Sequence, residues 1–249
     1  MKKIIREDKK SGWTQITVAD ERFYCKQNPE TLENMFVPSV TWICSFYPKG
    51  YAFYKWLANK GWDEAEALKS AAGDKGSKVH YAISDLIDGK IVKMESEYIN
   101  PSTEKPEPLT LEEYECILSF VNWYKETKPE FIAHEVVVFN NEVGYAGTVD
   151  YICKIKGVPY IVDFKTGAAI WPEHELQISA YKHASAKPDD YKLAILQLGY
   201  GRNKKGFKFT DIEDKFSLFM SAFSIWRNET TGQEPFKKDY PLELKLGGE

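Results

Sequence analysis

The sequence of 249 residues contains few cysteines and no cysteine pattern of the kind that binds metal. Its four cysteines, Cys25, Cys44, Cys116 and Cys153, are widely scattered, and no two form a C-x-x-C pair. This spacing argues against a zinc site or a disulfide framework, so we expect ordinary reduced thiols. The sequence also lacks a G-x-x-x-x-G-K-[ST] phosphate-binding loop, which argues against a nucleotide-driven motor.

Long hydrophobic runs are absent too. No apolar stretch approaches the roughly 20 residues that a helix needs to cross a bilayer. The first residues, MKKIIREDKK, lack the apolar centre of a signal peptide and include acidic residues, which transit peptides avoid. We therefore expect a cytoplasmic protein without a membrane partner.

Neither sign of charge dominates, because 33 basic residues are balanced by 37 acidic ones and the formal net charge is −4 at pH 7. This balance gives no global argument for nucleic acid as a partner, although a local basic patch can still bind phosphate groups. What the sequence does contain is 43% hydrophobic and 14% aromatic residues. That content supports a real core, and the length fits a single domain over residues 1–249.

The first half of the chain is expected to be mostly helical. Residues 1–37 are interpreted as a partly extended N-terminal segment and residues 38–128 as a helical elaboration of the domain. Apolar periodicity and stop signals predict helices over about 51–60, 63–89 and 110–127. A break is expected near Gly73 and Gly76 in the second helix, and the proline-rich residues 101–109 are expected to form a loop.

After Pro129 the character of the sequence changes to β. Runs rich in β-branched and aromatic residues, separated by Asn-Asn and Lys-Gly turn signals, predict strands at 134–140, 144–155, 158–167, 192–200 and 206–212. A helix over about 172–186 and a last helix over about 214–228 precede a charged tail that ends at 249. This order predicts an α/β or α+β fold with a central mixed sheet flanked by helices.

The hairpin around Lys156-Gly157 carries charged residues on strands that are otherwise apolar. Asp150 and Asp163 lie at comparable distances from the turn, so their carboxylates can converge, and Lys165 shares a strand face with Asp163. Two close carboxylates suit a hard cation such as Mg²⁺ or Mn²⁺, and an adjacent ammonium group can orient water or stabilise charge on a phosphate. The alternative is a structural Asp–Lys pair on an exposed face.

The helix that follows the hairpin carries two further polar side chains. Gln177 and Tyr181 are four residues apart and therefore share one helical face. Both are suited to contacting a sugar–phosphate backbone or stacking on a base. The alternative is that Tyr181 is a core residue and Gln177 a surface residue.

Four short motifs follow one another in a specific order. They are G-S-K-V-H at 76–80, G-T-V-D at 147–150, D-F-K at 163–165 and Q-I-S-A-Y at 177–181. The series resembles the RecB-like branch of the PD-(D/E)XK nuclease superfamily, which is marked by a histidine on an early helix, G-x-x-D, a (D/E)-x-K strand and a Q-x-x-x-Y helix. The resemblance implies a restriction-endonuclease-like core.

The resemblance extends beyond these motifs. The segment PSVT that starts at Pro38, followed by an aromatic helix, is similar to phage and mitochondrial genome-maintenance exonucleases of the same branch, so the likeness covers about residues 38–210. It implies a catalytic core over 129–213 and a C-terminal helix and tail over 214–249. The cell in which it acts is then expected to be bacterial or phage-infected.

The same resemblance assigns roles to individual residues. Asp150 and Asp163 would bind Mg²⁺ or Mn²⁺ together with the backbone carbonyl of Phe164, and Lys165 would position or activate the attacking water. His80 would complete the coordination sphere, with a surface or packing role as its alternative. Some relatives hold an iron–sulfur cluster through four cysteines, three of them near the C terminus. This chain does not match that pattern, so no such cluster is expected.

Other polar residues are candidates on position alone. Glu135, on the strand before the hairpin, is a candidate ligand or base, or a solvated edge residue. Thr166 and Gly167 follow the lysine, where a hydroxyl group and a close backbone could meet a phosphate, and His174 could face the same cleft. The 201–208 loop offers a basic patch for DNA, or a plain solvated hairpin tip, through Arg202, Lys204, Lys205 and Lys208.

The expected function is a divalent-metal-dependent deoxyribonuclease, an exonuclease acting at DNA ends or on single strands in recombination, repair or replication. An endonuclease of the same fold, or a nuclease partner of a helicase or recombination protein, would carry the same residues. A catalytically silent DNA-binding accessory module is the alternative from another class. The sequence shows no convincing Ser/His or Cys/His arrangement, which agrees with direct attack by water.

Overall fold

The computed structural model describes residues 3–8, 11–18, 21–28, 30 and 33–230. Within these residues it contains a five-stranded mixed sheet flanked by helices, as the sequence predicts, and two smaller antiparallel sheets. No helix in the described part of the chain is both long and apolar enough to cross a membrane.

The central sheet carries the two aspartates. Its strands follow the order β11-β10-β9-β8-β7, and only β9 and β10 run parallel. The strands are β7 (Glu130–Asn140), β8 (Tyr145–Ile155), β9 (Val158–Lys165), β10 (Lys192–Leu198) and β11 (Phe207–Ile212). All five predicted strands are therefore confirmed, with shifts only at their ends.

A two-residue turn fixes the register of the β8–β9 hairpin. Lys156 and Gly157 have φ angles of 53° and 80°, the positive values typical of a tight hairpin turn whose twist matches that of the strands. Pairing continues from this turn to Tyr151 and Val162. The next residues along the two strands are Asp150 and Asp163, so the turn brings the two acids opposite each other.

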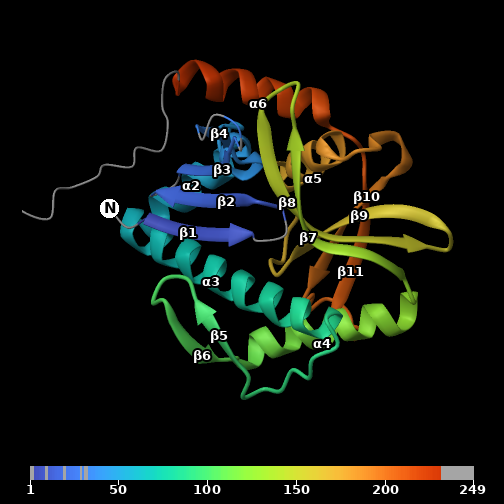
Figure 1. The fold of residues 1–249 in the computed structure, drawn as a ribbon. Helices are drawn as coiled ribbons and strands as arrows, with labels where there is room; N and C mark the ends of the chain where they lie inside the picture. The colour runs from blue at the N-terminus through green and yellow to red at the C-terminus, as the bar shows by residue number, and fades with distance from the viewer. Residues whose placement is uncertain (1–2, 9–10, 19–20, 29, 31–32, 231–249) are drawn as a thin grey trace, which may run out of the picture.

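Helices cover both faces of the central sheet (Figure 1). Buried side chains of α3 (Trp62–Ile87) and α4 (Leu111–Thr127) pack on one face around Phe120, Tyr151 and Phe164. Residues of α1 (Val40–Cys44), α5 (Pro172–Ala184) and α6 (Phe216–Glu229) pack on the other face. The remaining helical elements are α2 (Tyr51–Lys60) and a short 3-10 turn, η1 (Pro188–Asp190).

The N-terminal segment, predicted to be partly extended, forms a sheet of its own over its described residues between Lys3 and Pro38. Four antiparallel strands follow one another in chain order, and they are β1 (Lys3–Asp8), β2 (Trp13–Val18), β3 (Glu21–Gln27) and β4 (Asn34–Pro38). Trp13, Tyr24 and Val37 pack against Ala146 of β8. These three side chains are buried by contact with a strand that is distant in the sequence. No local sequence pattern predicts such a contact.

Two expectations about the helical region are wrong. Helix α3 runs without a break through Gly73 and Gly76, because the burial of Val79, Ala82 and Ile83 in its second half outweighs the roughly 1 kcal/mol that each glycine costs. The expected loop at 101–109 contains a strand. It belongs to the hairpin of β5 (Glu97–Asn100) and β6 (Lys105–Pro108), where prolines are tolerated because each strand has a free edge.

The other predicted helices are confirmed. Helix α2 has the predicted bounds, and α4 begins after Thr110, whose side chain forms a reciprocal capping box with Glu113. Helix α5 begins at Pro172 as expected and ends two residues early, at Ala184. The last helix, α6, begins two residues late, and most of the charged tail lies outside the described residues.

Candidate metal centre

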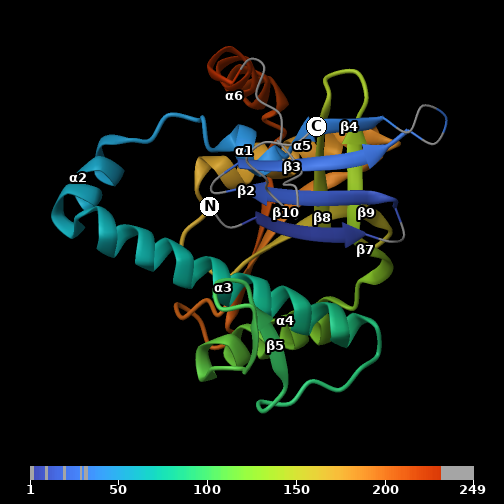
Figure 2. The ribbon, with the colours of Figure 1, turned by 60° about the vertical axis from the view of Figure 1, so that its left-hand side comes forward.

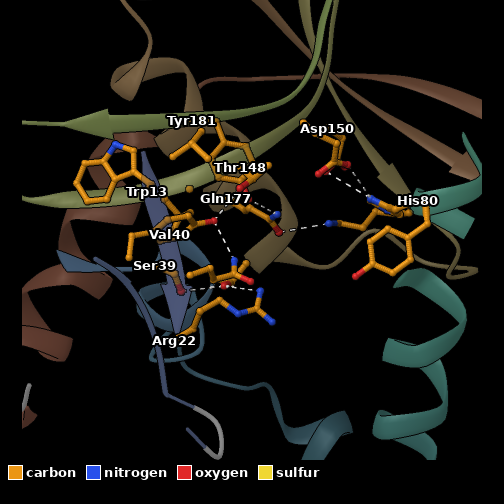
Figure 3. A pocket seen from close by; sticks show the side chains of 17 residues that line it. Trp13, Arg22, Ser39, Val40, His80, Thr148, Asp150, Gln177 and Tyr181 are labelled. Carbon is orange, nitrogen blue, oxygen red and sulfur yellow. Dashed lines mark hydrogen bonds and ion pairs between the residues drawn. The ribbon is translucent and has the colours of Figure 1, made fainter. Parts of the chain in front are cut away.

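Five predicted site residues, His80, Asp150, Lys165, Gln177 and Tyr181, line one cavity of about 490 Å³ (Figure 3), and Asp163 lies behind its wall in contact with Lys165 and Gln177. It opens between the N-terminal sheet, α3, the β7–β8 ribbon and α5. Its charged and strongly polar lining residues are Gln15, Arg22, His80, Glu135, Asp150, Lys165 and Gln177, and aromatic walls come from Trp13, Tyr24, Tyr81 and Tyr181.

Asp163 is the most deeply buried acid of the site, with 1% of its surface exposed. Its Oδ2 atom lies 2.7 Å from the Nζ atom of Lys165, and its Oδ1 atom accepts a hydrogen bond of 3.1 Å from Gln177. Although Lys165 provides a compensating charge, no described group donates a well-aligned hydrogen bond to Oδ2. A buried carboxylate oxygen in this state still has a lone pair to offer to a cation.

Asp150 lies across the hairpin and is held by the backbone. Its Oδ2 atom accepts a hydrogen bond of 2.7 Å from the N–H group of Phe164, while its Oδ1 atom lies 3.5 Å from Nδ1 of His80. Phe164 therefore takes part in the site through its N–H group. The proposed role of its carbonyl as a metal ligand stays a prediction.

Both aspartates carry raised pKa values. Burial raises the pKa of Asp150 from 3.8 to about 6, against the opposing effects of Lys165 and of the hydrogen bond from Phe164. Burial also raises the pKa of Asp163 to about 6; Lys165 lowers it and the neighbouring Asp150 raises it further. Burial thus disfavours the charged forms of both acids, and a cation beside them would favour those forms.

Lys165 shows the complementary behaviour. Burial alone would lower the pKa of its ammonium group, but Asp163 and Asp150 raise the pKa above its usual value. The Nζ atom also donates a hydrogen bond of 3.3 Å to Oε1 of Gln177. Lys165 is thus a charged, oriented ammonium group inside the cavity.

The group with the geometry of a metal site is His80, Glu135 and Asp150. One ligand atom from each of the three lies within 4.8 Å of the others, and Nδ1 of His80 is 3.9 Å from Oε1 of Glu135. Asp163 does not belong to this group and is held instead by Lys165 and Gln177. Glu135, which the sequence marks only as a candidate on position, is therefore one of the three residues with the geometry of metal ligands.

The backbone of Glu135 is strained. Its φ angle of 50° lies in the left-handed region, which a residue with a side chain adopts at a cost of order 1–3 kcal/mol. The pairs around it are His134 with Tyr151 and Val136 with Val149, so Glu135 stands opposite Asp150 on the neighbouring strand. With this irregular backbone, the Glu135 carboxylate lines the cavity together with that of Asp150.

Helix α5 supports the site through Gln177 and Tyr181. Gln177 donates hydrogen bonds to Asp163 and, at 2.7 Å, to the hydroxyl group of Tyr181. The Tyr181 side chain is almost fully buried, and burial raises its pKa well above the usual value. Tyr181 therefore orients Gln177 from within the core, and its exposed edge is too small for extensive stacking on a base.

Close packing explains why the G-T-V-D motif begins with a glycine, Gly147. A Cβ atom on Gly147 would lie 2.4 Å from Cε1 of Tyr181 and 3.3 Å from Cγ2 of Val40. Only glycine lets the Tyr181 ring approach β8 this closely. The motif thus joins the packing of α5 to the position of Asp150, three residues further along the strand.

The N-terminal sheet supplies a cavity wall that sequence reasoning missed. The hydroxyl group of Tyr24 lies 2.8 Å from Oγ1 of Thr148, and Gln15 donates to the same hydroxyl group. Arg22 lines the cavity (Figure 3) and donates a hydrogen bond of 3.5 Å to Oγ1 of Thr41. No local signal marks these residues, because only tertiary packing brings β2 and β3 to the site.

Several predicted site residues do not line this cavity. Thr166 packs near Gly76 of α3, and a hydrogen bond from Gln197 reaches the carbonyl of Gly167. The basic loop stands apart from the cavity, and its Lys205 forms an ion pair of 2.6 Å with Glu126. The other basic residues of that loop, Arg202, Lys204 and Lys208, do not line the cavity either.

His174 lines a second, adjacent groove. Burial and, to a smaller extent, the nearby Lys165 and Lys49 lower its pKa to about 3. Its Nδ1 atom accepts a hydrogen bond from the N–H group of Trp171. His174 is therefore neutral at physiological pH and helps to shape the start of α5.

The donors of the cavity fit a hard divalent cation. Carboxylate oxygens are the preferred ligands of Mg²⁺, and an imidazole nitrogen among them favours Mn²⁺. Asp163 offers a buried oxygen with no aligned donor, and Asp150 has a raised pKa that a cation would lower. The residues that would hold the ion are His80, Glu135 and Asp150, with Asp163 beside them.

Comparison with known proteins assigns no family to this chain. Neither a search of protein-family models nor a search of curated proteins produced a match. The motifs, and the cavity that their residues line, are therefore the features that bear on function.

Proposed function

We propose that this protein is a divalent-metal-dependent deoxyribonuclease of the PD-(D/E)XK type, acting as an exonuclease at DNA ends or on single strands. The observation that carries the proposal is the convergence of four separate motifs on one cavity. Their residues are His80, Asp150, Asp163, Lys165, Gln177 and Tyr181, joined by hydrogen bonds and ion pairs. Coincidental matches scattered over about 100 residues would have no reason to meet in space.

Each residue has a chemical role in this proposal. His80, Glu135 and Asp150 would hold Mg²⁺ or Mn²⁺, with Asp163 next to them. The bound ion would polarise a phosphate oxygen and favour ionisation of water. The ammonium group of Lys165 lies beside Asp163, where it can orient the attacking water and stabilise the negative charge that develops on the phosphate.

The hydrolysis needs no covalent intermediate on the protein. The oxygen of a water molecule attacks phosphorus, the bond from phosphorus to the leaving sugar oxygen breaks, and that oxygen takes up a proton. Gln177 holds both Asp163 and Lys165, so it keeps the carboxylate and the ammonium group in fixed relation. Arg22 provides a second cation on the opposite wall for a neighbouring phosphate.

The proposed partner is DNA, in the cytoplasm of a bacterium or a phage-infected cell. An endonuclease, or the nuclease partner of a helicase, would use the same cavity. A silent DNA-binding module is disfavoured because the acids and Lys165 are retained in a buried, costly arrangement, which binding alone does not need.

The test is cleavage of end-labelled single- and double-stranded DNA with Mg²⁺ or Mn²⁺. Wild type should release nucleotides, while Asp163→Ala and Lys165→Ala should be slower by at least about a hundredfold, because they remove charge that acts in the transition state. Lys154→Ala is the matched control, an exposed lysine on the same hairpin, and should retain activity.

The substrate can be varied to separate the alternatives. A covalently closed circle should resist an exonuclease, and cutting of the circle would instead indicate an endonuclease. If wild type and both variants bind DNA equally and leave it intact, the protein is an accessory module and the proposal is wrong.

A further inference from the structure

A second groove, of about 790 Å³, adjoins the metal cavity, and Thr41 and Gln177 line both. The groove lies between α1, α2 and the start of α5. Its walls are mainly apolar and include the aromatic side chains of Tyr47, Phe53, Trp56 and Trp171. The same glutamine that holds Asp163 therefore stands at the junction of the two spaces.

Three aromatic rings of this groove, those of Phe53, Trp56 and Trp171, belong to none of the hydrophobic core clusters that the described residues form. Helix α2 contains no buried residue, although four of its ten residues are aromatic. Phe53, Trp56 and Trp171 have exposed fractions of 37%, 39% and 58%. Figure 2 shows α2 and the first turns of α3 extending away from the central sheet. Large exposed aromatic surface next to a site indicates a binding surface.

The composition of the groove favours flat, uncharged ligand groups. Its cation, Lys49, forms an ion pair with Glu173 and also lies 5.8 Å from the centre of the Phe53 ring. Burial lowers the pKa of His174, so this side chain adds no positive charge at neutral pH. Phosphates would therefore find few cations here, whereas the faces of nucleobases would find aromatic rings.

We propose that this groove is a base-stacking subsite, in which Phe53, Trp56 and Trp171 take unpaired bases of the strand whose phosphate lies in the metal cavity. The inference rests on the proposed nuclease function and narrows its substrate to nucleic acid that is single-stranded next to the scissile bond. Continuity through Gln177 is the reason to choose this occupant, because Gln177 lines both spaces and a strand whose phosphate lies in the metal cavity can continue past it into the groove. Paired bases have no free faces to offer the rings.

The test measures binding without cleavage, by fluorescence anisotropy of labelled oligonucleotides with EDTA present. We expect wild type to bind a short oligothymidylate more tightly than a blunt duplex. Trp56→Ala and Trp171→Ala should each weaken single-strand binding by roughly five- to hundredfold, the effect of losing one stacked base. Trp62→Ala is the matched control, because Trp62 is 68% exposed on α3 and does not line the groove.

An abasic oligonucleotide sharpens the experiment. It should lose affinity for wild type by a similar factor, and should lose little further affinity for the Trp56→Ala, Trp171→Ala double variant. Equal binding of normal and abasic strands by wild type would overturn the inference, as would wild-type affinity in the double variant. Circular dichroism would verify that the variants are folded, which is expected since both rings are exposed.

The remaining outcomes separate this inference from the proposal that it rests on. Cleavage of DNA by wild type with no effect of either tryptophan variant would reject the subsite and leave the nuclease. Neither binding nor cleavage by wild type would reject both. A dimer in sedimentation that Trp56→Ala converts to a monomer would show that a second copy fills the groove, and the inference would be wrong.

Discussion

The metal cavity and the aromatic groove meet at Gln177, yet they are built in opposite ways. The cavity holds charges inside the protein, where Asp163 is 1% exposed and needs Lys165 and Gln177 to be tolerated. The groove exposes aromatic rings to solvent: Phe53 and Trp56 lie on a helix with no buried residue, and Trp171 lies just before α5. The buried charges of the cavity thus lower the stability of the folded state, whereas the exposed rings of the groove contribute little to that stability.

Different measurements therefore report on the two regions. Changes in the cavity should alter stability, metal affinity and turnover together, because the same charges serve all three. Changes in the groove should alter nucleic-acid binding and leave stability nearly unchanged.

The largest effect should be a dependence of stability on pH and metal. Asp150 and Asp163 have folded-state pKa values of about 6, above their unfolded value of 3.8. Protonation therefore favours the folded state, and this contribution is complete below about pH 4 and lost as the pH rises through about 6. Because the two acids interact, the loss belongs to the pair and is on the order of a few kcal/mol, at about 1.36 kcal/mol per pH unit.

Thermal unfolding in EDTA and in Mn²⁺ would measure this effect. We expect Mn²⁺ to raise the melting temperature more at pH 7.5 than at pH 5, because the cation replaces the protons. Asp163→Asn should flatten the pH dependence measured in EDTA. An equally steep profile in that variant would mean that other groups, and not this pair, control the stability.

The second effect concerns the contact between Gly147 and Tyr181. Gly147→Ala places a Cβ atom 2.4 Å from the Tyr181 ring, so we expect a loss of about 1–3 kcal/mol in the free energy of unfolding. Activity should fall as well, because Tyr181 orients Gln177. The measurements are denaturant unfolding and DNA cleavage.

A second glycine provides the control for this substitution. Gly73 lies within α3 and has nothing within 4 Å of an added Cβ atom. Gly73→Ala should therefore stabilise the protein by about 0.5–1 kcal/mol and leave cleavage unchanged. Equal effects of the two substitutions would contradict a specific role of Gly147.

The sequence was sufficient to predict the parts of the site that lie on one local element. The turn at Lys156-Gly157 and the alternation of β9 place Asp150, Asp163 and Lys165 together, and both features are local. The sheet strands and α5 were predictable for the same reason. The sequence identifies Gly147 only as part of the G-T-V-D motif. The close approach of the Tyr181 ring, which requires glycine at this position, is visible only in the structure.

What could not be predicted depends on contacts between distant segments. Glu135 takes its place from an unusual φ angle opposite Asp150, and Arg22 from the packing of the N-terminal sheet on β8. The continuity of α3 through Gly73 depends mainly on buried residues that lie several positions further along the helix. In each case tertiary energy overrides a local preference, which a single sequence does not display.

Substitution of Glu135 should affect stability and metal binding in opposite directions. Glu135→Gly relieves a left-handed backbone and should leave stability unchanged or raise it by up to about 1 kcal/mol. The same substitution removes a ligand and should weaken Mn²⁺ binding by roughly 10–100-fold, measured by calorimetry. Lys156→Gly, at a φ angle of 53°, is the control that relieves a similar backbone without touching the site. Unchanged Mn²⁺ binding in Glu135→Gly would show that the ion is held without this carboxylate.

The smallest effect should come from the basic loop, and it tests how far DNA extends from the cavity. Lys205 is exposed and already paired with Glu126, so Lys205→Ala should change the free energy of unfolding by less than about 1 kcal/mol and DNA binding by little. Arg22→Ala, inside the cavity, should weaken DNA binding and lower the salt dependence by about one phosphate contact. Measuring affinity against salt concentration compares the two cations directly. A larger loss for Lys205→Ala than for Arg22→Ala would place the DNA path over the loop, as the sequence first indicated, and away from the wall that the N-terminal sheet provides.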